Sequence, residues 1–253
     1  MKVNDFIEKL MLAKNTPSLY VMGGWGFPLG YDGNKERTQT NAYNRRPERK
    51  EKIFSDSSNN KFSWDCCGMV KGIVWGWNRD YTKKNGGAVY ASNGLPDWDA
   101  KEIMFKGTTE QSTDFSKIDP GEFLWLDGHC GVYLGNGLSM ESTPSWDDGV
   151  QITAVSNIGE IPGYHSRKWT YHGHLKCIDY SSKYPNPPFD VTCTLKGTSF
   201  KSSPYGGAQN IVGTVKLGSK LTVESLEGSS GDFAKVTCFI YLPGGFSHDN
   251  KPL

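Results

Sequence analysis

The sequence lacks several features that mark common classes of protein. Its net charge is only +1, from 28 basic and 27 acidic residues in 253, so no strong attraction to nucleic acid is expected. No apolar run approaches the roughly 18–20 residues of a membrane-spanning helix. The six cysteines do not follow the paired spacing of a zinc site. We therefore expect a monomer that requires no metal and no cofactor and binds neither nucleic acid nor membrane.

The N-terminal segment also lacks the layout of a secretory signal peptide. Residues 1–14 are predicted to form an amphipathic helix, with Phe6, Leu10 and Met11 on its apolar side. Cysteines scattered in this way are typical of a protein made in a reducing cytosol with one functional thiol. We expect synthesis in the cytoplasm without a leader.

The length and composition favour a chain of two domains. A proline-rich polar stretch, 181–188, is predicted to be a stiff linker between 1–180 and 189–253. In the second of these, short strand-like pieces alternate with glycine turns, which favours a small all-β barrel near the lower size limit for independent folding. Cys193 and Cys238 lie on its first and late strands, and that placement is compatible with either a disulfide or two free thiols.

One segment, 63–77, begins with polar residues and cysteines and continues as an apolar run, which predicts a helix. Asp65 can cap its N-terminus by accepting backbone N–H groups. Cys66 then lies in the first turn, where the helix dipole stabilises a thiolate, the reactive form of cysteine. Cys67 is turned about 100° around the axis and is expected to pack inward. The alternative interpretation of Cys66 is a core cysteine at a strand–helix junction.

Glycine recurs along one side of this predicted helix, at Gly68, Gly72 and Gly76, while the apolar spacing extends to Trp77. Each glycine costs about 1 kcal/mol relative to alanine in a helix. The stripe therefore predicts close backbone packing on that side, against a sheet or a substrate groove.

Residues 129–141 have the signature of a β-hairpin around Gly135-Asn136-Gly137. A three-residue loop there would pair Gly131 with Glu141 and bring the Glu141 carboxylate to the face that holds His129. A two-residue turn would send Glu141 to the opposite face. We predict the three-residue loop, and we expect the missing side chain of Gly131 to leave room for the carboxylate beside the imidazole.

These two segments together supply the parts of a thiol catalyst. Cys66 would be the nucleophile, His129 the base that takes the thiol proton, and Glu141 the group that orients the imidazole. The thiolate would attack an acyl carbon to give a thioester that water hydrolyses. Backbone N–H groups at the helix start, including that of Cys66, would stabilise the oxyanion.

Two other groups of polar residues are interpreted as surface features. His172 and His174 share a face of a strand predicted within 169–180, but no third metal ligand accompanies them. A polar excursion over 30–60 carries a basic cluster, which is either a solvated face or, because it precedes the cysteine, a grip for an acidic substrate. The cluster consists of Arg45, Arg46, Arg49, Lys50 and Lys52.

Four motifs occur in chain order: Tyr20-Val-Met-Gly-Gly, Asp65-Cys66-Cys67-Gly68, Pro120-Gly121-Glu122-Phe-Leu-Trp and Gly128-His129-Cys-Gly-Val-Tyr. In this order they resemble the NlpC-type family of papain-like cell-wall cysteine peptidases. That family shows a Tyr-x-x-Gly-Gly turn, an Asp-Cys-Ser-Gly helix start, a Pro-Gly-Asp lead-in and a Gly-His-Val-Gly-Ile-Tyr strand. The resemblance covers about residues 5–180, and the 189–253 segment is similar to bacterial SH3-like wall-binding modules.

The resemblance implies an α+β, papain-like catalytic domain with a central antiparallel sheet, followed by an SH3-like barrel. It implies a peptidoglycan hydrolase that cuts an amide bond of the stem peptide, either at the γ-D-glutamyl link or at the sugar–alanine link. Features around residues 75–78, 86–94 and 140–144 look like the version found in phages and prophages, hence an endolysin. The protein would then act at the bacterial cell wall, outside the cell or after release by a holin.

The resemblance also assigns residues. Cys66 matches the family's nucleophile, His129 its base, and Tyr20 a tyrosine that lines the substrate cleft, where Asp65 and Cys67 are also expected. There are two departures, because Cys67 replaces the usual serine and Glu141 replaces the histidine of many members.

Two rival functions remain open at this point. One is a non-catalytic wall-binding or phage structural protein on the same fold. The other keeps the enzyme but makes it an acyltransferase or transpeptidase.

Overall fold

A computed structural model gives the structure of the chain. It describes residues 1–55 and 60–181, together with the backbone of five strands between residues 189 and 237. Contacts divide the chain into two compact units, Met1–Lys183 and Tyr184–Leu253. The boundary between them falls inside the segment 181–188 that the sequence marks as a linker.

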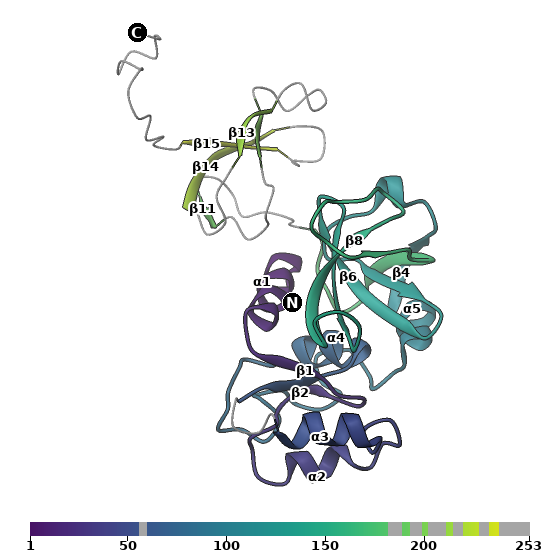
Figure 1. Ribbon diagram of the computed structural model, residues 1–253. Coiled ribbons are helices and arrows are strands. Elements are labelled where there is room, and N and C mark those ends of the chain that lie inside the picture. The colour runs from purple at the N-terminus through teal and green to yellow at the C-terminus, as the bar shows by residue number, and fades with distance from the viewer. Residues whose placement is uncertain are drawn as a thin grey trace. The chain divides into compact units, whose positions relative to one another are not determined.

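The first unit combines few helices with two sheets (Figure 1). Its first helix begins at Val3 and ends at Lys14, as the apolar spacing predicts, and buries Phe6 and Leu10. None of the helices in the described part of the chain is long and apolar enough to cross a bilayer. The helices are α1 (Val3–Lys14), α2 (Asn34–Thr38), α3 (Pro47–Ser55), α4 (Cys66–Val74), α5 (Ala100–Gly107) and the short 3-10 helix η2 (Phe115–Lys117).

The smaller sheet of this unit has three short strands, β1 (Ser18–Tyr20), β2 (Trp25–Pro28) and β3 (Phe62–Trp64). Their order is β1-β3-β2, with β3 parallel to β1 and antiparallel to β2. Because β3 leads directly into α4, this sheet fixes where the helix begins.

The larger sheet has seven strands in the order β4-β10-β5-β6-β7-β8-β9, and all neighbours are antiparallel except β8 and β9. Helix α4 lies between β2 of the small sheet and β6 and β7 of the large one (Figure 1). The strands are β4 (Thr108–Ser112), β5 (Phe123–Leu126), β6 (His129–Gly135), β7 (Leu138–Thr143), β8 (Gly149–Val155), β9 (Ser166–Arg167) and β10 (Tyr171–Leu175).

The turn between β6 and β7 differs from the prediction of a three-residue loop. Gly135 pairs with Leu138 and closes a two-residue turn, in which Asn136 and Gly137 both have positive φ, at 54° and 75°. This geometry matches the twist of a hairpin. A register shift between Tyr133 and Gly135 follows at once. A bulge of this kind adds one residue to one strand.

The bulge has a consequence for the rest of the hairpin. Beyond the bulge, Val132 pairs with Met140. One residue further along, the same register places Gly131 opposite Glu141, as predicted. A two-residue turn alone would have moved Glu141 to the other face. The loop length was therefore predicted wrongly, but the bulge restores the register beside His129.

Helix α4 is shorter than the apolar spacing indicates. It ends at Val74, and Gly76 beyond it has a φ of +97°. The indole N–H of Trp75, just after the helix, donates to the carbonyl of Leu95 at 2.6 Å. Trp77 is nevertheless fully buried, edge-on to Trp64.

Two of the three glycines in the predicted stripe, Gly68 and Gly72, pack against backbone as predicted, whereas Gly76 lies beyond the end of α4 and has no backbone neighbour on that side. A Cβ on Gly68 would lie 1.7 Å from the carbonyl oxygen of Gly24, and one on Gly72 would lie 2.3 Å from that of Trp25. No side chain fits at such distances. These glycines therefore let α4 approach the start of β2 closely. Of the two neighbours that were predicted, a sheet or a substrate groove, the neighbour is the sheet.

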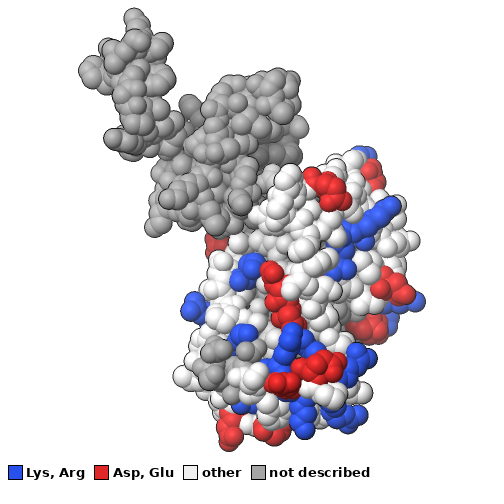
Figure 2. Space-filling model, in the orientation of Figure 1, with Lys and Arg blue, Asp and Glu red and all other residues white. Residues whose placement is uncertain are grey.

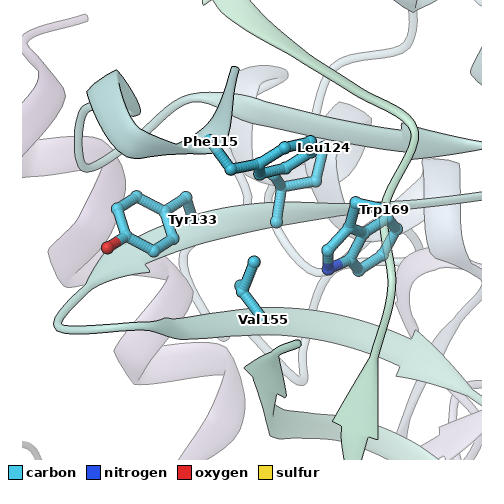
Figure 3. Packing of buried hydrophobic residues seen from close by; sticks show 5 residues of the cluster. All are labelled: Phe115, Leu124, Tyr133, Val155 and Trp169. Carbon is cyan, nitrogen blue, oxygen red and sulfur yellow. The ribbon is translucent and has the colours of Figure 1, made fainter. Parts of the chain in front are cut away.

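Around β6, five buried side chains form a compact cluster: Phe115, Leu124, Tyr133, Val155 and Trp169 (Figure 3). They come from η2, β5, β6, β8 and the segment before β10. Burial of side chains of this size contributes about 1.5–3 kcal/mol each. This cluster fixes the position of β6, on which His129 lies.

The basic cluster of residues 45–52 is a solvated face with one exception. Arg45, Arg46, Lys50 and Lys52 are exposed, but Arg49 is buried. Its guanidinium donates to both carboxylate oxygens of Asp148, at 2.8 and 2.7 Å, and to the carbonyl of Tyr20. On the face of the molecule in view, basic and acidic side chains are intermingled (Figure 2).

The described part of the second unit consists of strands, which agrees with an all-β segment. Antiparallel pairing joins β11, β14 and β15 in one sheet and β12 with β13 in another. Cys193 and Cys238 lie outside the described residues. The strands are β11 (Phe189–Thr192), β12 (Ser199–Lys201), β13 (Ile211–Thr214), β14 (Lys220–Glu227) and β15 (Phe233–Thr237).

Candidate active site

Cys66 is the first residue of α4, and Asp65 caps the helix. One carboxylate oxygen of Asp65 accepts the N–H of Gly68 at 2.5 Å, and the other accepts the N–H of Gly23 at 2.7 Å. The carboxylate thus joins the helix start to the glycine turn after β1. Burial raises the pKa of Asp65 to about 7. Asp65 therefore acts in this structure as the residue that positions Cys66.

His129 lies at the start of β6 between the cysteine and a carboxylate. Its Nε2 is 2.7 Å from Oε2 of Glu141 on β7, and its ring lies close enough to the Cys66 thiol for each group to shift the pKa of the other. Since Nε2 is engaged by Glu141, the Nδ1 atom is the one left for the sulfur. The side chain of His129 is 14% exposed and Cys66 is half-buried, so the pair reaches the surface.

The surroundings favour a charged pair of thiolate and imidazolium. Hydrogen bonds with Cys130 and Cys67, and then the hydrogen bond and positive charge of His129, lower the pKa of Cys66 well below its usual range despite burial. Burial alone would lower the pKa of His129, but hydrogen bonds to Cys66 and Glu141 outweigh it and raise that pKa to about 9. Proton transfer from the thiol to the ring is therefore favourable before any substrate binds.

The two vicinal cysteines differ in their chemistry. A hydrogen bond with Cys130 lowers the pKa of Cys67, but the bond to Cys66, burial and the negative charges of Cys66 and Asp65 raise it far more. Cys67 therefore stays a protonated thiol beside the Cys66 thiolate. This contrast supports Cys66, and not Cys67, as the nucleophile.

Two residues that the sequence interpretation missed hold Glu141. The Nε of Arg167 donates to Oε1 of Glu141 at 2.9 Å, its NH2 group is 2.8 Å from Oε2, and the hydroxyl of Thr153 donates to Oε1 at 2.7 Å. The carboxylate has no exposed surface. Burial raises its pKa, but the bonds to His129 and Arg167 lower it further, so it remains ionised. No local pattern marks Arg167 or Thr153, because they reach the site through β8 and β9.

Trp169, which precedes β10, also belongs to the site. The indole of Trp169 stacks on the ring of His129, with centroids 5.6 Å apart and planes 11° apart. The same indole lies over Gly131, where a Cβ would come within 2.9 Å of it. The space above Gly131 is thus filled by an aromatic ring and was wrongly expected to accommodate the Glu141 carboxylate.

Tyr20 lies beside the thiol but is nearly buried. Burial, and next the charge of Cys66, raise the pKa of its phenol, so the hydroxyl stays protonated. Its ring meets that of Tyr43 edge-on, with centroids 5.9 Å apart, and its carbonyl accepts from the guanidinium of Arg49. The structure therefore brings together Cys66, His129, Glu141, Asp65, Cys67 and Tyr20, all six of the predicted site residues.

His172 and His174 are not the surface residues that the sequence predicted. His172 is buried, with Nδ1 hydrogen-bonded to Glu122 and Nε2 3.1 Å from the carbonyl of Asp114. Nε2 of His174 lies 3.1 Å from the other oxygen of Glu122, and its ring stacks on Tyr180. Both histidines lie on β10, which pairs with β5, and Glu122 comes directly before β5. Its buried carboxylate therefore lies between the two imidazoles.

Two groups among the described residues place three potential metal-ligating atoms within 4.8 Å of one another. One contains Cys66, Cys67 and Cys130 and coincides with the thiol site. The other contains Asp119, Glu122 and His174 and coincides with the buried ion-pair network under β10. In the first group the sulfurs contact one another. In the second, Nε2 of His174 lies 3.1 and 3.6 Å from oxygens of Glu122 and Asp119 but makes no hydrogen bond.

No protein-family model and no curated protein matches this chain. The functional assignment therefore depends on the motifs and on the geometry of the site.

Proposed function

We propose that this protein is a cysteine hydrolase that cleaves an amide bond of the stem peptide in bacterial peptidoglycan. The observation that supports it most is the position of His129, which is hydrogen-bonded to the buried carboxylate of Glu141 and interacts electrostatically with the thiol of Cys66. Nucleophile, base and orienting group in this arrangement are the parts of a thiol hydrolase. The substrate class is proposed from the order of the four sequence motifs.

The first half of the reaction would form a thioester. The Cys66 thiolate attacks the carbonyl carbon of the amide, and its electron pair makes the carbon–sulfur bond. The N–H of Gly68 is occupied by Asp65, so the N–H of Cys66 is the first-turn donor that we assign to the developing oxyanion. Collapse of the tetrahedral intermediate breaks the carbon–nitrogen bond, and the His129 imidazolium gives its proton to the leaving amine.

The second half would release the acyl group. His129, now neutral, accepts a proton from water, and the resulting hydroxide attacks the thioester carbon. Breakage of the carbon–sulfur bond regenerates the thiolate, and His129 is again protonated. Throughout, Glu141 holds the ring and stabilises its charge, and Arg167 keeps Glu141 ionised.

The setting that we propose follows from the same motifs. A wall hydrolase of this type would act at the bacterial cell wall in phage-type lysis, and the second unit would bind the wall as an SH3-like module does. The bond cut is either the γ-D-glutamyl link or the sugar–alanine link, since both are amides open to the same chemistry.

The test is digestion of purified cell walls by the full chain. Wild-type protein is expected to clear the walls and Cys66→Ser to be inactive, while Cys177→Ser, which removes a thiol remote from the site, is expected to keep full activity. Mass analysis of the released fragments identifies the bond and separates hydrolysis from transfer to another amine. Activity that survives in Cys66→Ser but not in Cys67→Ser would overturn the assignment of the nucleophile.

The rival is a non-catalytic protein that keeps this fold. The reactivity of Cys66 would distinguish the two functions, because a wall-binding role needs no thiolate. Rapid alkylation of Cys66 by iodoacetamide at neutral pH is expected for the hydrolase. Absence of both alkylation and wall clearing in a folded protein would favour the rival.

A further inference from the structure

Three thiols meet at the candidate active site, although the proposed hydrolysis uses one. The sulfurs of Cys66 and Cys67 are 3.9 Å apart, and those of Cys67 and Cys130 are 3.6 Å apart. All three lie within 4.8 Å of one another. Cys66 and Cys67 come from the first turn of α4, and Cys130 comes from β6, which packs against that helix.

The three thiols differ in their access to solvent. Cys66 is half-buried at the helix start, whereas Cys130 has no exposed surface. A small oxidant from solution would therefore meet Cys66 first. An accessible, thiolate-rich cysteine next to a second cysteine is the arrangement found at sites of reversible oxidation.

The geometry also distinguishes which thiol can bridge to Cys66. The Cα atoms of adjacent residues are about 3.8 Å apart, below the roughly 4.4–6.8 Å that disulfides span. A bridge between Cys66 and Cys67 would thus distort the first turn of α4. Cys130 comes from a different element, so this limit does not apply to it, and its sulfur lies within 4.8 Å of that of Cys66.

We propose that Cys66 and Cys130 form a reversible disulfide when a hydroperoxide oxidises Cys66. The proposal shares the reactive Cys66 with the proposed function but does not require the protein to hydrolyse peptidoglycan. The disulfide would block the nucleophile and at the same time protect it from irreversible oxidation.

The chemistry balances in two steps. The Cys66 thiolate attacks the distal oxygen of the hydroperoxide, the oxygen–oxygen bond breaks, and with one proton the products are a sulfenic acid and an alcohol, or water from hydrogen peroxide. The Cys130 thiol then attacks the sulfenic sulfur, forms the sulfur–sulfur bond and displaces hydroxide, which leaves as water with the thiol proton. A dithiol reductant restores both thiols by exchange.

The neighbours of Cys130 suit its role as the second thiol. Burial raises the pKa of the Cys130 thiol, hydrogen bonds with Cys66 and Cys67 raise it further, and the negative charge of Cys66 adds to the shift. Conversion of the Cys66 thiolate into a neutral sulfenic acid removes that charge. Cys130 therefore becomes easier to deprotonate only after Cys66 has been oxidised.

The experiment treats the full chain with a small excess of hydrogen peroxide and follows the Cys66 thiol. In the wild type, and in Cys67→Ser, we expect a mass lower by two hydrogens, a peptide that links Cys66 with Cys130, and nearly complete recovery of the thiol on reduction with dithiothreitol. In Cys130→Ser we expect two added oxygens on Cys66 and loss of most of the thiol beyond recovery. Cys177→Ser is the matched control and should behave as the wild type.

Three results would overturn the proposal. One is a cross-linked peptide without Cys66 in the wild type, another is a link between Cys66 and Cys67 alone, and the third is equal recovery of the thiol in Cys130→Ser and wild type. Circular dichroism checks that Cys130→Ser is folded, and Cys130→Ala replaces it if it is not. The readouts are thiol content and peptide mass, which do not depend on hydrolysis. A wild-type protein that forms the link but clears no walls would therefore contradict the proposed function and leave the disulfide proposal intact.

Discussion

The Nε2 atom of His129 lies 2.7 Å from Oε2 of Glu141, twelve residues further along the chain and on the neighbouring strand. This contact orients the imidazole so that its other nitrogen is left for Cys66. It exists because a bulge in β6 offsets a two-residue turn.

Glu141→Gln should lower the rate of wall hydrolysis by about 10²-fold or more, because the amide cannot stabilise the imidazolium. The turnover number should fall more than the apparent affinity for the wall. The measurement is initial clearing rate against wall concentration. Thr153→Val, which removes a hydrogen bond from an uncharged donor to the same carboxylate, is the control and should have a much smaller effect. An unaltered turnover number in Glu141→Gln would contradict the orienting role.

Arg167→Met should impair activity even though Arg167 contacts Glu141 and not the nucleophile. The change removes two of the charge-assisted contacts to Glu141, so the pKa of that buried carboxyl should rise. We expect the lower limb of the pH–activity profile to move to higher pH. Lys168→Met, at the exposed neighbouring position, is the control. Identical pH profiles for Arg167→Met and wild type would argue against this role.

Activity should decline as the pH rises through about 9, where His129 loses the proton that the leaving amine needs. The same titration affects stability. The pKa of His129 is raised in the folded state, so its stabilising contribution is complete below about pH 6.5, the unfolded value, and is lost as the pH passes about 9. Clearing rates and thermal unfolding temperatures measured between pH 6 and 10 check the two effects. A clearing rate or an unfolding temperature that does not change over this range would contradict the corresponding effect.

His129→Ala should move the pH midpoint of Cys66 alkylation upward, toward the roughly 8.5 of an ordinary thiol. The hydrogen bond and charge of His129 are among the causes that lower the pKa of Cys66. Iodoacetamide labelling followed by peptide mapping gives the midpoint for Cys66 alone. His165→Ala, an exposed histidine that stacks on Trp146, is the control and should leave the midpoint unchanged.

Arg49→Met should destabilise the first unit by about 3–5 kcal/mol, because it leaves Asp148 nearly buried with weaker charge compensation. Lys52→Met removes the other cation that contacts Asp148, but this lysine is exposed, so its loss should cost about 1 kcal/mol or less. Urea unfolding of the two variants compares the pair directly. Equal losses in both would mean that burial of Arg49 does not govern its contribution.

Most of the candidate site could be predicted from the sequence because its signals are local. The cap at Asp65, the position of Cys66 in the first turn and the strand that carries His129 each follow from a few neighbouring residues. The pairing of Glu141 with this strand also follows, although the predicted loop was one residue too long. Sequence spacing cannot reveal a bulge, since it adds a residue to one strand without changing the pattern of the other.

The errors and omissions concern contacts across the fold. Arg167 and Thr153 reach Glu141 from β9 and β8, and Arg49 was counted with a solvated cluster until the fold placed it against Asp148. His172 and His174 were assigned to the surface because nothing nearby in the sequence shows that Glu122 lies beneath them. In each case a charged group is buried because its partner comes from a distant segment.

The sequence by itself determined where the helix of Cys66 begins and which residues supply the sulfur, the imidazole and the carboxylate, because capping and strand alternation act over a few residues. Only the tertiary structure decided that three cysteines share one site, that Trp169 covers the imidazole and that Arg167 keeps Glu141 ionised. These facts depend on how α4 packs against β6 and on the order of strands in the sheet. Both are set by the burial of many side chains together, which no short segment of sequence encodes.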